Sequence, residues 1–164
     1  MASIILLASL FSSAKEDNKD FNKMANKMAS KFNTPIVTSA YLSSLPSSKD
    51  AIILDAREIG EFNVSSIKGA KHVGYEKFDI EKTIKNLDKN KKIIVYCSVG
   101  YRSGEIAKKL KAKGYNAHNL HGGLFGWVNE GRAVSNANGE TTKVHGYNRE
   151  WSKWLKKGEI VYNE

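Results

Sequence analysis

The chain has 164 residues, of which 41% are hydrophobic and 26% are charged, a profile that suits one globular domain and excludes a disordered or collagen-like protein. The formal net charge is +9. We find neither a zinc-finger spacing nor an aromatic RNA-binding motif, so we predict no nucleic-acid partner and assign the lysines to solvated surfaces that favour small anions.

Residues 1–35 form an N-terminal extension in our division of the chain. Within residues 1–14, the apolar stretch Ile4–Phe11 is too short to span a bilayer, so we predict no membrane span. It fits either a signal-type segment of a protein exported to the periplasm or a helix packed on a cytoplasmic protein, and we leave both open. From Asp20 to Phe32 apolar residues recur every three or four positions, which predicts an amphipathic helix.

Short apolar strands alternate with helices across residues 36–131, which we take as the main domain. Strands are predicted at Ile36–Val37, Ala51–Leu54, Ala70–Val73, Lys92–Tyr96 and Tyr115–Leu120. Helices are predicted at Ser39–Leu45, Ile80–Leu87, Ser103–Lys113 and Gly123–Val128. This alternation predicts an α/β fold with a central, mostly parallel sheet flanked by helices.

Residues 132–164 form a C-terminal extension with a different composition. Tyr147, Trp151, Trp154 and Leu155 follow one another at near-helical spacing. We interpret the segment as an aromatic helix that packs on the main domain.

Cys97 is the only cysteine and comes directly after a predicted buried strand. In open α/β sheets, ligands bind outside the carboxyl ends of the strands. Gly100 allows the loop to curl so that backbone amides face an anion, and we expect Ser103 to open the next helix, whose N-terminus favours negative charge. Such a nest stabilises the thiolate, the nucleophilic form of cysteine. Arg102 adds a positive charge at the end of the loop.

Several cysteine chemistries are less compatible with the sequence. The four histidines lie outside any recognised nucleophile motif, which argues against a cysteine protease. One cysteine and dispersed histidines offer no zinc-ligand spacing, so we predict no metal. Cysteine-dependent phosphatases place five residues between cysteine and arginine, whereas four lie between Cys97 and Arg102. The shorter loop favours a terminal sulfur atom over a phosphoryl group.

Four segments in register resemble the rhodanese family. They are Asp55–Glu58 with Glu61–Phe62, Ile67–Val73, Ile94–Ser103 and Leu120–Trp127. The resemblance implies a central parallel five-stranded sheet and a catalytic Cys97 that carries sulfane sulfur as a persulfide. It implies further that a cradle binds that sulfur, made of Ser98, Val99, Gly100, Tyr101, Arg102 and Ser103. Many family members carry a basic residue directly after the cysteine, where this chain has Ser98.

The resulting hypothesis is a thiosulfate sulfurtransferase without a cofactor. A small anionic donor such as thiosulfate would load Cys97, and cyanide, a thiol or a protein would accept the sulfur. We expect Asp55 and Arg57 to support the site as an ion pair, and we expect a monomer. Two alternatives stay open: a rhodanese-type module that only binds or relays sulfur within a complex, and, less compatible with the loop, a phosphatase.

Overall fold

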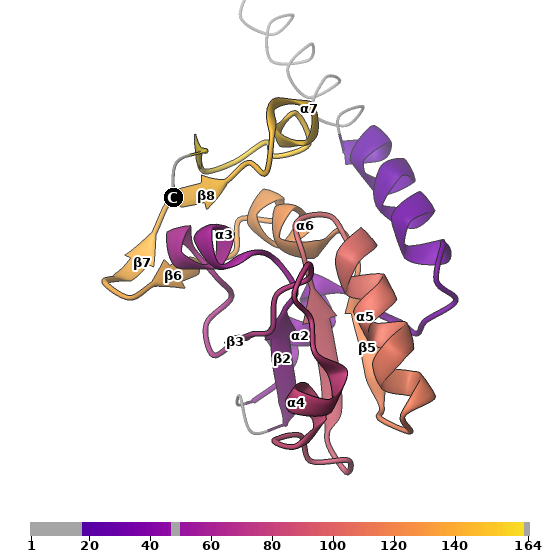
Figure 1. The fold of residues 1–164 in the computed structure, drawn as a ribbon. Coiled ribbons are helices and arrows are strands. Elements are labelled where there is room, and N and C mark those ends of the chain that lie inside the picture. Colours follow the sequence, from indigo (N-terminus) through magenta and orange to yellow (C-terminus); the bar gives the residue numbers. More distant parts are fainter. Residues whose placement is uncertain (1–17, 47–49, 163–164) are drawn as a thin grey trace, which may run out of the picture.

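The computed structural model describes residues 18–46 and 50–162 and contains one five-stranded parallel sheet (Figure 1). Its order is β1-β5-β4-β2-β3. The strands are β1 (Ile36–Val37), β2 (Ala51–Asp55), β3 (Lys71–His72), β4 (Lys92–Tyr96) and β5 (Ala117–Leu120). The predicted α/β class and central parallel sheet are confirmed.

Apolar packing on both faces explains why the central strands form. In β4, Ile93, Ile94, Val95 and Tyr96 are fully buried, as expected for a strand covered on both sides. Successive side chains point to opposite faces, so Ile94 and Tyr96 join one apolar cluster while Ile93 and Val95 join the other.

Helices cover each of these two faces. The helix over residues 18–30, predicted from its apolar spacing, packs through Phe21 and Ala25 on one face. The same face carries α2 (Ser39–Ser44) and α6 (Gly123–Asn129). The opposite face carries α4 (Ile80–Ile84) and α5 (Tyr101–Ala112). A further helix, α3 (Ile59–Val64), follows β2.

The strand register brings the carboxyl ends of β2, β4 and β5 to one edge of the sheet. Asp55 pairs with Tyr96, and Val95 pairs with Asn119. Each of these strands is followed by a helix that starts at this edge, α3, α5 and α6 respectively. The residues that link strand to helix therefore meet where parallel α/β sheets bind ligands.

The C-terminal extension is not the single helix that we predicted. It forms a hairpin of β6 (Val134–Asn136) and β7 (Gly139–Thr141), followed by β8 (Lys143–His145), a four-residue α7 (Arg149–Ser152) and β9 (Glu159–Val161). β9 pairs in parallel with β8. The aromatic spacing is misleading because Trp151, Trp154 and Leu155 pack inwards from one short helix and the turn that follows it.

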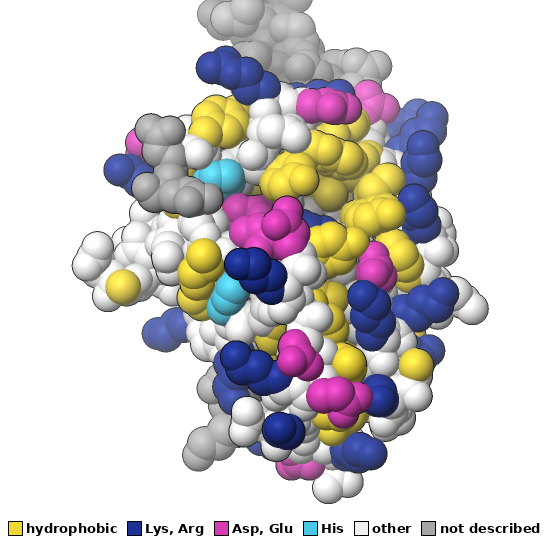
Figure 2. Space-filling model, viewed as in Figure 1, with side chains coloured by type: hydrophobic (Ala, Val, Ile, Leu, Met, Phe, Trp, Pro, Cys, Tyr) yellow, Lys and Arg dark blue, Asp and Glu magenta, His cyan; other side chains and the backbone are white. Residues whose placement is uncertain are grey.

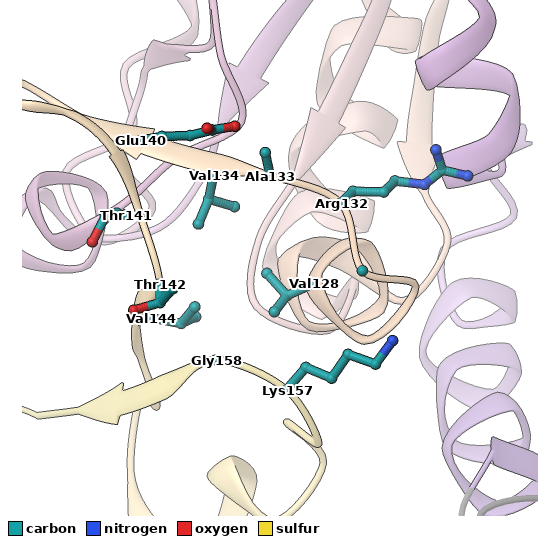
Figure 3. A pocket seen from close by; sticks show the side chains of 11 residues that line it. Val128, Arg132, Ala133, Val134, Glu140, Thr141, Thr142, Val144, Lys157 and Gly158 are labelled. Carbon is teal, nitrogen blue, oxygen red and sulfur yellow. The ribbon is translucent and has the colours of Figure 1, made fainter.

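The extension packs on α6 through apolar side chains. Val134, Val144 and Leu155 are buried in the same cluster as Val128 of α6. Beside them lies a cavity of about 630 Å³. Figure 3 shows Val128, Val134 and Val144 turned toward its centre, whereas Arg132 extends away from it.

The N-terminal apolar stretch, for which we left a signal-type segment and a helix open, lies outside the described residues. Within residues 18–46 and 50–162, no helix is both long and apolar enough to cross a membrane.

Candidate active site

Cys97 follows β4 directly and is only 2% exposed. Its carbonyl oxygen accepts a hydrogen bond from the backbone N–H of Leu124 at 2.8 Å, and that of Ser98 accepts one from Phe125 at 3.0 Å. These bonds tie the loop after β4 to the first turn of α6. The contact is so close that a Cβ atom on Gly123, whose φ is +56°, would lie 2.3 Å from the carbonyl oxygen of Cys97.

The thiol is surrounded by donors from its own loop and from α5. The backbone N–H of Gly100 donates to Sγ of Cys97 at 3.1 Å. The Ser103 hydroxyl oxygen lies 3.4 Å from Sγ and 2.7 Å from Oδ1 of Asn119, so its single hydrogen serves one of them at a time. Asn119 also donates to the carbonyl oxygen of Gly100 at 2.8 Å. The arrangement suits a negative charge on sulfur.

The start of α5 differs from the prediction. The helix begins at Tyr101 with Gly100 as its N-cap at φ +106°, rather than at Ser103. The positive φ, which glycine adopts without steric cost, lets the chain enter the helix earlier. Ser103 therefore lies inside the first turn, where its hydroxyl turns to the thiol instead of capping the helix. The free N–H groups and positive partial charge of a helix N-terminus lie immediately after the loop.

Arg102 holds the loop through a carboxylate that we did not predict as a site residue. Its guanidinium donates to both carboxylate oxygens of Glu61, at 2.6 and 2.8 Å, and to the Ser98 hydroxyl at 3.0 Å. The Ser98 hydroxyl donates to Glu61 at 3.0 Å. Arg102 was expected to attract an anionic donor as well, but Glu61 neutralises its charge.

The hydrogen bonds and charges of this ion pair oppose the effect of burial on both pKa values. Burial alone would raise the pKa of Glu61, yet the hydrogen bonds and charge of Arg102 hold that pKa below its ordinary value. Burial alone would lower the pKa of Arg102, yet its hydrogen bonds and ion pair with Glu61 raise that pKa. Both groups therefore stay ionised at neutral pH.

Asp55 and Arg57 form a second ion pair, which is fully buried and lies beside the strand that precedes Cys97. Nη2 of Arg57 lies 2.6 Å from Oδ2 of Asp55 and also donates to the carbonyl oxygen of Ser65. The next residue after Asp55, Ala56, donates its N–H to the carbonyl oxygen of Tyr96 at 2.8 Å. The pair thus fixes the chain next to the residue that precedes Cys97.

The remaining predicted loop residues point elsewhere. Val99 is buried in the apolar core, and the ring of Tyr101 packs edge-to-face on Phe32 at 5.1 Å. Asn119 and Glu61 were missed. Asn119 could have been found as a polar residue within a predicted buried strand. Glu61 is identified only by its contact with Arg102, which lies 41 residues further along the chain.

Metal ligands are not assembled in the described part of the chain, where no group of three or more His, Cys, Asp or Glu side chains could hold an ion.

The model of the rhodanese-like domain family matches residues 38–130. The chain belongs to this family. In this rhodanese-like domain the matched segment covers β2 to β5, the cradle and α6, whereas the helix 18–30, β1 and residues 132–162 lie outside the match.

Curated relatives of this rhodanese-like domain include sulfurtransferases. The tRNA sulfurtransferase of Desulfurococcus amylolyticus is 34% identical over 86 residues, which are 52% of this chain and 16% of that protein. The putative sulfurtransferase YtwF of Bacillus subtilis is 30% identical over 95 residues, which are 58% of this chain and 90% of that protein. The matched region is thus a small part of the first relative and nearly all of the second.

Solved structures agree with the fold. A rhodanese-related protein from Thermoplasma volcanium has a TM-score of 0.54 and 28% identity, covering 61% of this chain and 96% of that one. A protein from Bacillus halodurans has a TM-score of 0.57 and 25% identity, covering 74% of this chain and 88% of that one.

Proposed function

We propose that this rhodanese-like protein transfers sulfane sulfur through a persulfide on Cys97. The observation that supports the proposal best is the position of Sγ, which receives the Gly100 N–H at 3.1 Å next to the N-terminus of α5. Backbone amides in a buried site stabilise negative charge that develops on an atom held in front of them. In a Cys97 persulfide, the negatively charged outer sulfur would lie close to these amides.

The reaction has two balanced steps. The Cys97 thiolate attacks the outer sulfur of thiosulfate, a new S–S bond forms, and the old S–S bond breaks with its electron pair leaving on sulfite. An acceptor such as cyanide or a thiolate then attacks the outer persulfide sulfur, and the electron pair returns to Cys97 as the thiolate. No net oxidation occurs and no cofactor is needed.

Two features of the site indicate a low affinity for thiosulfate. Ser98 stands where many rhodanese-like proteins have a basic residue, and the charge of Arg102 is compensated by Glu61. A dianion therefore gains little from side-chain charges at this site. We propose thiosulfate as an effective assay donor with a high KM.

A relay of sulfur between proteins is the second candidate. The putative sulfur carrier protein YrkF of Bacillus subtilis is 30% identical over 94 residues, which are 57% of this chain and half of that protein. A persulfide that forms readily but turns over slowly with cyanide and small thiols would favour this relay over a small-molecule enzyme.

Steady-state kinetics test the proposed function. With thiosulfate and cyanide varied together, we expect parallel lines in double-reciprocal plots, because the first product leaves before the acceptor binds. Cys97→Ser should form no thiocyanate. Thiocyanate formation by that variant, or hydrolysis of an aryl phosphate by the wild type, would overturn the assignment.

A further inference from the structure

Both extensions outside the matched family segment contact the cradle, each through an aromatic ring. Phe32, after the N-terminal helix, packs on Tyr101, and Tyr147 of the C-terminal extension lies over Arg102 with its ring centre 4.8 Å from the guanidinium. Tyr101 and Arg102 are the two residues that follow Gly100. The two extensions therefore flank the start of α5, next to Cys97.

Tyr147 is held in an unfavourable backbone conformation. Its φ is +63°, which bulky L-residues rarely adopt. Its N–H donates to Nδ1 of His145 at 3.0 Å, and Gly146 donates to the carbonyl oxygen of Val161 at 2.9 Å. On the other side, Asn148 caps α7. Such strain persists only where the surroundings fix the residue, and it concentrates at functional sites.

The Tyr147 ring lies over the part of the cradle that adjoins Cys97. Arg102, which the ring covers, donates a hydrogen bond to the hydroxyl of Ser98, the residue directly after Cys97. The side chain of Arg102 is only 12% exposed, while Tyr147 remains 46% exposed and presents its outer surface to solvent. Figure 2 shows hydrophobic side chains gathered on this face, between α7 and α5.

We propose that Tyr147 is a specificity-determining residue that limits the size of the molecules that reach Cys97. The inference deepens the proposed function, since it concerns which acceptors the persulfide meets. The ring narrows the approach along Arg102, so that slim acceptors pass and broad ones are hindered. The C-terminal extension is then part of the site rather than an appendage.

Thiol labelling measures this access without relying on sulfur transfer. Because Cys97 is the only cysteine, every maleimide adduct reports its accessibility. N-ethylmaleimide and a fluorescein maleimide share one reactive group and differ in bulk. We expect Tyr147→Ala to raise the ratio of the bulky to the small rate constant about tenfold, the size of effect that a changed pocket wall produces.

Three matched variants show whether the ring itself is responsible. Tyr147→Phe keeps the ring and should keep the wild-type ratio. Tyr147→Gly removes the ring and also relieves the positive φ, so it should show the same raised ratio. It also keeps the test open if the alanine variant folds poorly. Tyr162→Ala truncates another half-exposed tyrosine of the same extension, which packs against Arg149, and should leave the ratio unchanged. An equal rise in Tyr162→Ala, or no rise in Tyr147→Gly, would overturn the inference.

Sulfur transfer then gives a second, separate result. From preloaded persulfide, Tyr147→Ala should accelerate transfer to glutathione about tenfold relative to cyanide. If the wild type forms no persulfide, the proposed function fails while the labelling ratio still decides the role of Tyr147. Equal acceleration of both acceptors would contradict size selection.

Discussion

Glu61 connects three parts of the site from a position 36 residues before Cys97 in the chain. Its carboxylate receives Arg102 through two hydrogen bonds, the Ser98 hydroxyl and the backbone N–H of Glu58. Because the Glu61 carboxylate is the charged partner of Arg102, removal of its charge leaves the buried Arg102 guanidinium without a compensating negative charge. The loop then loses its attachment to α3.

We therefore expect Glu61→Gln to lower the free energy of unfolding by about 3–5 kcal/mol, as when one partner of a buried ion pair is removed. Denaturant unfolding followed by circular dichroism measures this loss. Glu81→Gln is the matched control because Glu81 pairs with Lys113 at the surface, where a pair contributes about 1 kcal/mol or less. Equal losses in both variants would show that the Arg102 pair contributes no more than a surface contact.

The Glu61 contribution also depends on pH in a defined direction. Because its pKa is lower in the folded protein than the ordinary 4.5, its stabilisation is complete above that pH and is lost as pH falls through the folded pKa. The difference in stability between wild type and Glu61→Gln should thus shrink on acidification below pH 4.5. A difference that grows there would have the wrong sign for an ionised Glu61.

At the scale of elements, the close contact between α6 and the cradle depends on a glycine. Gly123 has φ +56°, and an added Cβ would lie 2.3 Å from the carbonyl oxygen of Cys97. We expect Gly123→Ala to cost at least about 2 kcal/mol of stability, since a clash with backbone cannot be relieved by a side-chain rotation. Thermal unfolding is the measurement.

Gly114→Ala separates the clash from the backbone strain. Gly114 also has a positive φ, +83°, but nothing lies within 4 Å of an added Cβ. Strain alone should cost about 1–2 kcal/mol there. If Gly123→Ala lowers the stability no more than Gly114→Ala does, the contact between α6 and the cradle is looser than the geometry indicates.

Local apolar patterns were sufficient to predict the central strands, the helix after residue 17 and the place of Cys97. They failed for β8 and β9, because strands of three residues are too short to show an alternating apolar pattern of their own. Ser103 was mistaken for a cap because a glycine can enter a helix at positive φ. Tyr147 carries no sequence signal, since its role depends on a ring placed over a distant arginine.

At the scale of the whole molecule, the C-terminal extension and the rhodanese-like domain share one apolar core. Val134, Val144 and Leu155 of the extension belong to the cluster that holds Ile94 and Leu120 of the sheet. Segments that share a core unfold together in small proteins. The extension should therefore not melt before the sheet.

The tryptophans make this cooperativity measurable. The three in the sequence are Trp127 of α6, and Trp151 and Trp154 of the extension. Tryptophan fluorescence therefore reports on the contact between α6 and the C-terminal extension, whereas far-ultraviolet circular dichroism reports on the secondary structure of the whole protein. We expect the two unfolding curves to coincide, and a fluorescence transition that precedes the loss of dichroism would show an extension that detaches alone.

The central claim is that Cys97 carries sulfur, and intact-protein mass spectrometry tests it most directly. After thiosulfate, the protein should gain the mass of one sulfur atom, lose it on addition of cyanide, and show no gain in Cys97→Ser. A wild-type protein that keeps its mass with thiosulfate and with other sulfane donors, or a gain that persists in Cys97→Ser, would contradict the persulfide carrier.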